Sequence, residues 1–436
     1  MGKWSTCGFL GGRGLELFGQ ICWWIAAGLT VLAAPVALWH LLRGLRGLFP
    51  MLARPVREER RLRFAVVVCA RNEQAVIGSL IDSLMAQRYP RDCFSVFVVA
   101  DNCTDGTAAE AARHGALVYE REDAQRVGKG CALSWAFDKL REDYGDRFDA
   151  AAVFDADNLV DPGFLAAVND VLCTGADVTQ GYRDSTNPDE SAVSSCYAVY
   201  WLLLMRFFHR ARYNSGLPCL VGGTGFAFRW SCIAQNGWHT QTLGEDSEFS
   251  LQQILAGRQI VPAYRAVFYD EQPTTWAVSF RQRFRWLVGS VQCMRYLPAC
   301  LKSLFHRQKG DGPRLAAAVD MTAYLLAAPA CTLLVVSGLF GLLAMAFTPA
   351  ALGARIVWCL ASFAGGWVFM TLLALLTVLL EHKPLKIYGR GILLFPVFLI
   401  PMGWMAVAAL LHPRTDWKPI VHTGRRNAAA PEMEKA

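Results

Sequence analysis

Short runs of apolar residues, mostly β-branched or aromatic, alternate with longer segments of helical pattern between residues 64 and 154. The apolar runs cover residues 64–68, 94–99, 117–119 and 151–154, and the helical patterns cover 73–85, 107–114 and 130–140. Nearly continuous apolar runs are typical of strands that are buried on both faces. Their alternation with helices predicts an α/β fold with a parallel, Rossmann-like sheet covered by helices on both sides.

Four longer stretches are apolar enough to cross a membrane. The first, residues 17–42, has no formally charged residue in 26 positions, and a spanning helix needs about 20. The others are residues 319–347, 356–380 and 392–411. Basic residues follow the first stretch from Arg43 onward, whereas only Lys3 and Arg13 precede it. The positive-inside rule therefore places the N-terminus outside and the following segment in the cytoplasm.

The C-terminal tail does not fit this topology. Simple alternation of four spans places the tail outside, yet it carries Arg414, Lys418, Arg425 and Arg426, and basic segments favour the cytoplasmic side. Either one stretch is re-entrant or interfacial, or the number of spanning helices is not four. The sequence leaves both alternatives open.

Composition and charge support a membrane protein. Hydrophobic residues make up 54% of the chain and charged residues 18%, against about 25% charged in a soluble domain. Residues 62–270 hold 18 Lys and Arg against 26 Asp and Glu, and the rest of the chain holds 25 against 10. The basic residues accompany the apolar stretches, so we expect anionic lipid headgroups and no nucleic acid as their partner.

The 14 cysteines include no CxxC pair, which predicts reduced thiols.

The middle of the chain contains three further helical patterns. Residues 191–212 form an amphipathic pattern, a helix opens at 243–248 and ends near residue 255, and residues 279–305 are rich in Arg and aromatic residues. The last of these suits the surface of a membrane. Glycines predict a flexible loop at 222–225, and a second loop is expected at 269–273.

Candidate chemistry lies at the predicted carboxyl ends of the strands, where sheets of this kind bind ligands. These ends hold Glu73, Asp101 and the pair Asp155 and Asp157. Residues two apart in an extended chain point to the same side, so the two aspartates converge. Paired carboxylates suit a hard divalent cation, which in turn binds phosphate. An acidic turn after a strand would give the same pattern without a metal.

A set of short motifs, in order along the chain, resembles the membrane-integrated, inverting glycosyltransferases of family 2, which include cellulose, hyaluronan and poly-N-acetylglucosamine synthases. The motifs are Cys69-Ala70-Arg71-Asn72-Glu73, Ala100-Asp101-Asn102, Gly128-Lys129-Gly130, Asp155-Ala156-Asp157, Gly223-Thr224-Gly225, Gly244-Glu245-Asp246 and Gln282-Arg283-Phe284-Arg285-Trp286. The resemblance implies a GT-A-type domain in the cytoplasm, embedded between transmembrane helices. Two positions depart from the family pattern: Gly244 stands where the motif has Thr, and Ala100 stands where many relatives have Asp.

The resemblance also implies roles for individual residues. Glu73 and Asp101 would bind the uridine of a UDP-sugar, and Lys129 would approach its nucleotide. Asp155 and Asp157 would hold Mg²⁺ or Mn²⁺ on the diphosphate, and Gln282 and Arg285 would complete the donor site.

On the acceptor side, the resemblance makes Asp246 the general base, with Glu245 and Glu248 as competing candidates. Trp286 would stack on the acceptor sugar, and Gly223, Thr224, Gly225 and Glu245 would line the acceptor site. Gln282, Arg285 and Trp286 share one helix face by their spacing.

The leading interpretation is a processive polysaccharide synthase that transfers a hexose or N-acetylhexosamine from a UDP-sugar with inversion. The alternative enzyme adds one sugar to ceramide or diacylglycerol, and a third hypothesis is a non-catalytic transport or partner subunit. The implied location is the cell membrane, with several spans. The sugar, the linkage, the oligomeric state and the presence of an accessory subunit stay open.

These interpretations divide the chain into five parts. Residues 1–60 form a transmembrane helix with a basic segment, and residues 61–278 form the transferase domain. Residues 279–313 form interface helices, residues 314–412 the C-terminal transmembrane helices, and residues 413–436 a basic tail.

Overall fold

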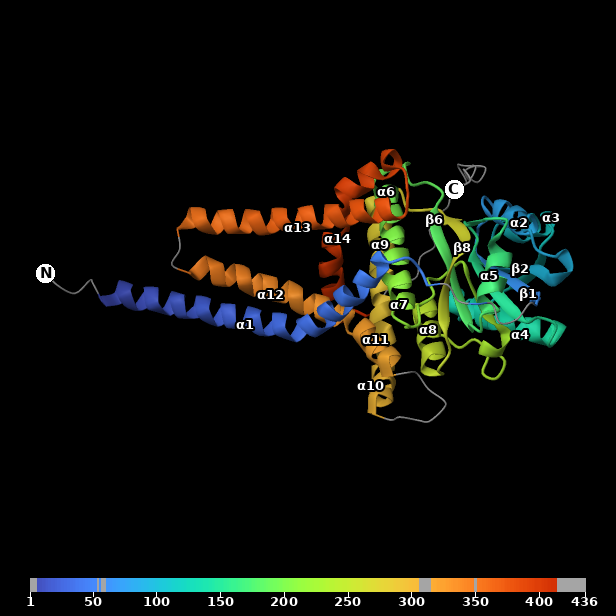
Figure 1. Cartoon of the computed structure of the whole chain (residues 1–436), viewed down its shortest axis with the longest axis horizontal. Coiled ribbons are helices and arrows are strands. Elements are labelled where there is room, and N and C mark those ends of the chain that lie inside the picture. The colour runs from blue at the N-terminus through green and yellow to red at the C-terminus, as the bar shows by residue number, and fades with distance from the viewer. Residues whose placement is uncertain (1–5, 53–54, 56–59, 306–314, 349–350, 414–436) are drawn as a thin grey trace.

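The computed structural model describes residues 6–52, 55, 60–305, 315–348 and 351–413. For residues 6–13 it describes the backbone alone. It has an α/β domain at one end and long apolar helices at the other (Figure 1). The predicted topology also used Lys3, Arg13 and the basic tail from Arg414 onward, which lie outside the side chains described.

One eight-stranded sheet forms the centre of the domain, in the order β3-β2-β1-β4-β7-β6-β8-β5. Its first half consists of β1 (Phe64–Ala70), β2 (Phe94–Asp101), β3 (Leu117–Arg121) and β4 (Ala150–Asp155). These four strands are parallel to one another, as predicted. The carboxyl ends of all four therefore lie at one edge of the sheet.

The second half of the sheet was not predicted. It comprises β5 (Leu159–Val160), β6 (Val178–Ser185), β7 (Phe226–Arg229) and β8 (Ile260–Asp270). Strand β7 is antiparallel to both β4 and β6, and β6 is parallel to β8. The sheet is thus mixed, and β6 and β8 end at the same edge as β4. The expected loop at 269–273 is wrong in its first two residues, because β8 continues through Asp270.

Helices cover both faces of the sheet, and each face has its own hydrophobic core. Val67 of β1 belongs to one core with Phe137 and Phe228, whereas Val66 and Val68 belong to the other with Phe164. This two-sided burial explains the continuous apolar run of β1. The covering helices are α2 (Ile77–Met85), α3 (Thr107–Arg113), α4 (Lys129–Tyr144), α5 (Phe164–Leu172) and α8 (Glu245–Leu255).

A layer of helices separates the sheet from the apolar helices. The predicted helix at 191–212 consists of α6 (Ala192–Leu204), a π-helical turn (Met205–Arg210) and α7 (Ala211–Asn214). The predicted helix at 279–305 consists of α9 (Trp276–Gln292), a 3₁₀ turn (Cys293–Tyr296) and α10 (Leu297–Phe305).

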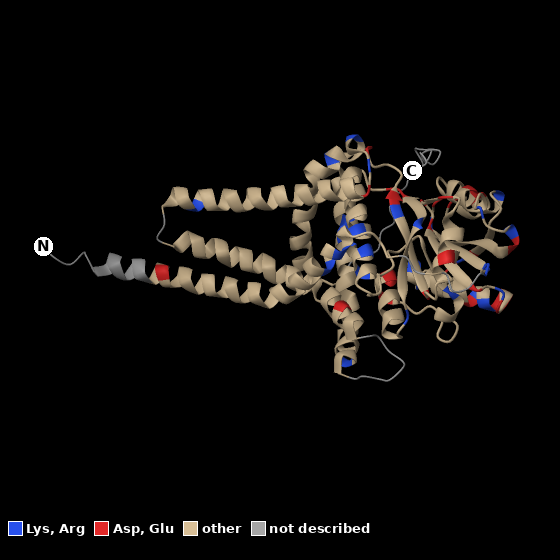
Figure 2. Ribbon diagram, in the orientation of Figure 1, with Lys and Arg blue, Asp and Glu red and all other residues tan. Residues whose placement is uncertain are grey.

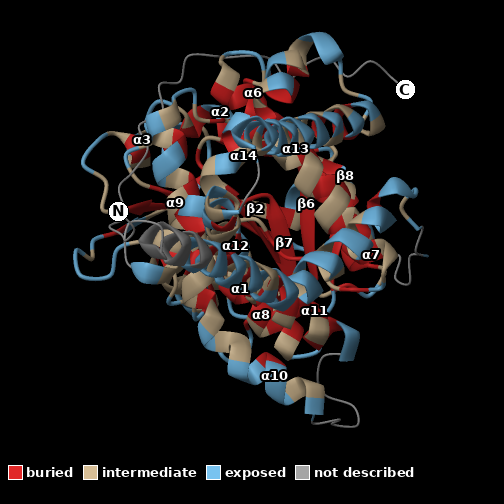
Figure 3. Cartoon of the chain, turned by 90° about the vertical axis from the view of Figure 1, so that its left-hand side faces the viewer, coloured by how far each residue is buried: buried red, intermediate tan, exposed pale blue. Residues whose placement is uncertain are grey.

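Four helices among the described residues are long and apolar enough to cross a membrane. They are α1 (Thr6–Gly44), α12 (Ala327–Phe347), α13 (Leu352–Leu380) and α14 (Leu385–Leu411). Charged residues gather on the α/β domain and in the helices next to it (Figure 2). Viewed from their free ends, the projecting helices are largely exposed, while buried residues fill the sheet behind them (Figure 3).

The apolar stretch predicted at 319–347 is divided into α11 (Leu315–Leu325) and α12. Asp320 of α11 is buried and forms an ion pair of 2.8 Å with Arg212 of α7. The indole of Trp39 in α1 also donates to Asp320, at 2.8 Å. Because a buried carboxylate needs such partners, Asp320 ties α11 and α1 to the domain side, and the long apolar run of α12 begins only after it.

Candidate active site

The predicted site residues gather at the edge of the sheet where β1, β2 and β4 end. Asp101 and Asp155 are the last residues of β2 and β4, and Glu73 follows β1. The loop that precedes β7 reaches the same edge because β7 is antiparallel to β4. The sheet topology therefore brings the acidic motifs and the Gly223–Gly225 motif together.

Lys129 connects Asp155 to the glycine loop. Its ammonium group donates to the Asp155 carboxylate and, at 2.7 Å, to the carbonyl oxygen of Gly223. Burial alone would lower the pKa of Lys129, but the carboxylates of Asp155 and Glu245 raise it. Lys129 is therefore a fixed cation between β4 and the loop. Gly128 has φ +125°, a conformation that L side chains rarely adopt, and it turns the chain into α4.

Asp157 lies beside a buried polar network around Asn158. The Asn158 amide donates to Asp270 at 2.9 Å and to Asp157 at 3.3 Å, and its oxygen accepts the hydroxyl of Thr224. The same hydroxyl oxygen of Thr224 accepts the backbone N–H of Asp155 at 2.9 Å. Thr224, predicted to line the acceptor site, is buried here and holds the turn between Asp155 and Asp157.

Asp155 and Asp157 fit part of a divalent metal site. Both are half-buried, and the Asp155 side chain is 40% exposed. Within the described ranges, no group of three or more His, Cys, Asp and Glu side chains is arranged to hold a metal. Two carboxylates are nonetheless the hard oxygen donors that Mg²⁺ and Mn²⁺ take, and Mg²⁺ usually binds through one or two carboxylates together with substrate phosphates and water. The donor set fits a metal that arrives with a diphosphate.

Asp246 and Glu245 open α8 opposite the glycine loop. A Cβ atom added to Gly223 would lie 3.5 Å from Oδ2 of Asp246, so this carboxylate faces the loop closely. Burial and the neighbouring Asp246 raise the pKa of Glu245 to about 7, against the opposing effect of Lys129 and Arg285. Burial also raises the pKa of Asp246, while the backbone N–H of Ser247, Lys129 and Arg183 lower it. Both adjacent carboxylates thus bind a proton more tightly than a carboxylate in water does, mainly because both are buried.

Glu248, the third acidic residue of this turn, has a structural role. Its carboxylate accepts the backbone N–H groups of Gln241 and Thr242, both at 2.7 Å, and the hydroxyl of Tyr296 at 2.8 Å. These three contacts engage both oxygens of the Glu248 carboxylate. Among the three acids, the geometry favours Asp246 over Glu248 as the group that faces the site.

Glycines allow the surrounding elements to approach this helix start. A Cβ on Gly289 of α9 would lie 2.7 Å from the backbone nitrogen of Gly244. A Cβ on Gly130 of α4 would lie 2.6 Å from Oγ1 of Thr240 and 3.4 Å from Cβ of Glu245. Gly244, which replaces the Thr of the family motif, thus pairs with Gly289 at a close crossing of two backbones.

The side chains of the motif from Gln282 to Trp286 on α9 lie in two different environments. Trp286 stacks on Tyr200 with ring centroids 6.3 Å apart and meets Trp201 edge-on at 5.4 Å. Arg285 lies near enough to Glu245 and Asp246 to lower the pKa of both. Oε1 of Gln282 is buried without a hydrogen-bond partner in the described part of the chain. Arg285 therefore faces the acidic site, and Trp286 belongs to an aromatic cluster with α6.

The motifs after β1 and β2 are interlocked. Asp101 is buried, accepting a short hydrogen bond of 2.5 Å from Arg121 and another of 2.9 Å from the Asn102 amide. The backbone N–H of Glu73 donates to Oγ1 of Thr107 at 2.9 Å, and Glu73 itself is half-buried. The structure thus gives Asp101 an ion pair with Arg121 that the sequence did not indicate.

Arg183 of β6 is a further residue of the site that the sequence analysis missed. Its guanidinium donates to the carbonyl of Gly222, lies 3.6 Å from the Asp270 carboxylate and stands 4.0 Å from the centroid of Trp201. It is buried and is among the cations that lower the pKa of Asp246. A strand with polar residues at most positions gave no signal in the hydrophobic pattern.

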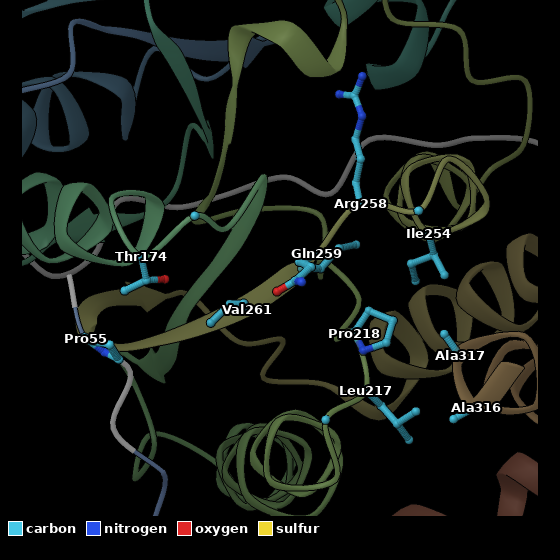
Figure 4. Close-up of a pocket in the computed structure, with 14 residues that line it drawn as sticks. Pro55, Thr174, Leu217, Pro218, Ile254, Arg258, Gln259, Val261, Ala316 and Ala317 are labelled. Atoms are coloured by element: carbon cyan, nitrogen blue, oxygen red, sulfur yellow. The ribbon is translucent and has the colours of Figure 1, made fainter. Parts of the chain in front are cut away.

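A cavity of about 400 Å³ lies elsewhere, at the amino end of β8 (Figure 4). Gln259, Ile260 and Val261 line it together with Thr174 and Pro218. None of the predicted site residues contributes to it. It opens at the opposite edge of the sheet from Asp155 and has no part in the site described here.

The family follows from a comparison of sequences. The family described as glycosyltransferase like family 2 matches residues 61–289. The chain belongs to this family. The match begins at the predicted start of the transferase domain and ends within α9.

Individual relatives of this family-2 chain are similar over about half of its length. A probable glycosyltransferase of Bacillus subtilis, YdaM, is 26% identical over 240 residues, which are 52% of this chain and 55% of that protein. The beta-monoglucosyldiacylglycerol synthase of Nostoc sp. is 26% identical over 272 residues, 58% of this chain and 55% of that protein. The glucomannan 4-beta-mannosyltransferase 1 of Oryza sativa subsp. japonica is 25% identical, over 51% of this chain and 44% of that protein. The chain thus spans about half the length of the curated relatives it matches.

A solved structure shows the fold. The mannosyltransferase PcManGT from Pyrobaculum calidifontis, in complex with GDP-Man and Mn²⁺, has a TM-score of 0.61 at 20% identity and covers 90% of this chain and 100% of its own. The α/β domain of the family-2 chain therefore has the GT-A fold, as predicted.

Proposed function

We propose that the chain is an inverting glycosyltransferase that moves a hexose from a UDP-sugar to a hydroxyl group of a membrane lipid. The observation that carries the transferase proposal is the meeting of Asp155, Lys129 and Asp246 at Gly223. The ammonium group of Lys129, which also binds the Asp155 carboxylate, and the carboxylate of Asp246 both lie next to Gly223. This is the arrangement that charge stabilisation of a leaving diphosphate and deprotonation of a hydroxyl require.

In this mechanism Asp246 is the general base. The acceptor oxygen attacks the anomeric carbon, the bond from that carbon to the diphosphate oxygen breaks, and the hydroxyl proton passes to the Asp246 carboxylate. Burial and Asp246 raise the pKa of Glu245 to about 7, so this carboxyl adds less negative charge to the acceptor side near neutral pH than an ordinary glutamate would. Lys129 and Arg285 supply positive charge near the site at which the diphosphate leaves.

Asp155 and Asp157 would hold Mg²⁺ or Mn²⁺ on the diphosphate, and the ion would neutralise charge on the leaving group. The structures of related fold support this assignment only in that PcManGT was solved with GDP-Man and Mn²⁺. Because that complex contains GDP-Man, a GDP-sugar is a necessary control when donors are tested. Glu73, Asp101 and Gln282 remain proposals for the donor site, and the division of the chain into five parts also remains a proposal.

We favour a lipid acceptor over the polysaccharide that the sequence alone suggested. Arg183 of the site lies against Trp201 of α6, and Arg285 of α9 lies near Asp246. The aromatic cluster around Trp286 includes Phe398 of the apolar helix α14. A lipid-linked hydroxyl would reach such a site from the membrane. A relative in Nostoc is named as a glucosyldiacylglycerol synthase, which agrees with this class of acceptor.

A polysaccharide product stays as the second candidate, because the rice relative is named as a glucomannan mannosyltransferase. A product assay separates the two. Membranes with the full chain are incubated with radiolabelled UDP-glucose, UDP-N-acetylglucosamine, UDP-glucuronate or GDP-mannose and then extracted with chloroform and methanol. A single labelled, chloroform-soluble product supports the lipid acceptor, and label in solvent-insoluble polymer contradicts it.

The catalytic assignment is tested with Asp246→Asn. This change keeps the shape of the side chain and removes the base, so transfer should fall by about 10² to 10⁴-fold while UDP binding stays near that of the unchanged protein. The control is Asp146→Asn, at an exposed position outside the site, which should leave transfer intact. Full turnover in Asp246→Asn would remove this residue from the mechanism.

We also propose that the chain is a multi-pass protein of the cell membrane with the transferase domain in the cytoplasm. The basic residues at the end of α1 and just after it, Arg43 and Arg46, support this orientation. Donor sugar, acceptor lipid and bilayer lipids are then the partners of the chain, and no nucleic acid is expected.

A further inference from the structure

The helix α14 has the composition of a membrane span but not the direction of one. The helices α1, α12 and α13 extend from the domain in the same direction, whereas α14 runs crosswise at their base (Figure 1). Its apolar window is 39% buried, compared with 11 to 17% in the other three. The difference arises because one side of α14 packs on the domain.

Both ends of α14 are fixed to the transferase side. At its start, the hydroxyl of Tyr388 donates to Asp184 of β6 at 3.3 Å, and the ammonium group of Lys383, just before the helix, donates to the same carboxylate at 2.5 Å. Beyond its end, the carbonyl of Pro413 accepts the side-chain amide of Gln292 at 2.9 Å. Gln292 also accepts the backbone N–H of Leu243, next to the Gly244-Glu245-Asp246 motif.

The middle of α14 is held by α6 and α9. The backbone N–H of Gly391 donates to Oγ of Ser195 at 2.9 Å, and Phe398 meets Tyr197 edge-on at 4.9 Å. A Cβ on Gly391 would lie 2.4 Å from the carbonyl oxygen of Ser195, so helices α14 and α6 touch there through their backbones. A helix of 27 residues is about 40 Å long, and contacts with the domain occur at its start, middle and end.

Arg283 of α9 completes this attachment. It is fully buried, its guanidinium donates to the carbonyl of Phe398, and it lies 4.0 Å from the centroid of that ring. Phe398 stands between Pro396 and Pro401, which interrupt the backbone hydrogen bonding of α14. A cation from the domain thus binds the helix at its proline-rich centre.

The opposite side of α14 is apolar and exposed. It presents Leu393, Val397, Ile400, Trp404 and Leu411, and α14 has no charged residue after Arg390. This side is continuous with the three projecting helices, since a Cβ on Gly403 would lie 3.0 Å from Cγ2 of Val335 in α12. The lipid that surrounds α12 therefore also reaches the exposed side of α14.

We infer that α14 lies along the membrane surface as an interfacial helix, with its apolar side in the acyl region of the leaflet next to the transferase domain. Three helices, α1, α12 and α13, then cross the bilayer. The chain leaves α14 at Pro413 on the side of the transferase domain. This arrangement agrees with the basic character of the sequence from Arg414 onward, which four spans would place on the opposite side.

The test compares three full-length chains that carry the same epitope at different places. One has it after Ala436, one after Asp146 in the exposed turn between α4 and β4, and one after Thr348 between α12 and α13. Antibody binding is measured on sealed spheroplasts and again after permeabilisation. We expect the epitopes after Ala436 and Asp146 to require permeabilisation and the epitope after Thr348 to be accessible without it. Equal accessibility of the Ala436 and Thr348 epitopes would overturn the inference.

A matched pair of substitutions tests the position of the helix itself. Ile400→Lys and Leu339→Lys each place a charge at an exposed apolar position, 43% exposed in α14 and 41% in α12. Lysine on an interfacial helix reaches the headgroups, whereas lysine in the middle of a span does not. Ile400→Lys should leave the amount of membrane-inserted protein within twofold of the unchanged chain, and Leu339→Lys should reduce it severalfold. Equal losses in both variants would contradict the interfacial position. Neither experiment depends on the enzymatic activity.

Discussion

Replacement of Glu245 by Gln should stabilise the protein at alkaline pH. Burial and Asp246 raise the pKa of Glu245 from 4.5 to about 7. The unfolded chain loses this proton near pH 4.5 and the folded protein keeps it up to about pH 7. The folded state therefore binds more protons in this window, and stability falls as the pH rises through it.

The magnitude follows from the same shift. One pKa unit corresponds to about 1.4 kcal/mol, so the ionised Glu245 lowers the free energy of unfolding by up to about 3 kcal/mol above pH 7. Glutamine resembles the protonated side chain and does not ionise. For a domain of about 200 residues, the gain amounts to roughly 6 to 12 °C in unfolding temperature. The gain should be complete at pH 8 and shrink as the pH approaches 4.5.

Intrinsic fluorescence of the purified full chain in detergent measures the apparent unfolding temperature at pH 8 and pH 5. The control is Glu248→Gln, three residues further on, where the carboxylate accepts three hydrogen bonds. That change should lower the unfolding temperature at both pH values. An equal gain for Glu245→Gln at both pH values, or no gain at pH 8, would refute the argument.

Three further predictions concern the site. Gly289→Ala should reduce the initial rate of transfer at least tenfold, because its Cβ would lie 2.7 Å from the nitrogen of Gly244, whereas Gly338→Ala, with open space around it, should not. Arg183→Lys should lower kcat at least tenfold through the loss of contacts to Gly222 and Asp270, and exposed Arg88→Lys serves as its control; equal rates for the two would exclude a role for Arg183. EDTA should stop transfer and added Mg²⁺ or Mn²⁺ should restore it, so undiminished activity in the chelator would contradict a metal on Asp155 and Asp157.

The parts of the fold that the sequence predicted are those with strong local patterns. The strands β1, β2 and β4 are apolar on both faces and carry few polar residues, so their runs stand out. Strand β3 begins with a short apolar run, Leu117-Val118, that was enough to predict it. Strand β6 did not, because buried Gln180, Arg183 and Asp184 interrupt its pattern. Each of these polar groups has a partner distant in the chain: Gly222 for Gln180, Asp270 for Arg183 and Lys383 for Asp184. Such pairing is invisible to periodicity.

The structure brings several of the predicted site residues to one edge of the sheet, but their contacts could not be predicted from the sequence. The apolar run before Asp155 and Asp157 was enough to predict that they lie at a strand end, whereas the contact of Lys129 with Gly223 depends on a loop 94 residues away. Gly244 departs from the family motif, and the sequence does not indicate that it lies at a close backbone crossing with Gly289. Hydropathy likewise predicted that α14 is a membrane span. The average hydropathy of a helix does not tell which of its sides is covered by neighbouring helices.

In the proposed mechanism, the double contact of Lys129 would link the binding of donor and acceptor thermodynamically. The same ammonium group binds the Asp155 carboxylate and the carbonyl of Gly223, so a diphosphate that draws this group toward itself would also change its contact with the loop next to Asp246. Linkage is reciprocal. If bound acceptor changes the affinity of the protein for the nucleotide sugar by a certain factor, bound nucleotide sugar changes the affinity for the acceptor by the same factor.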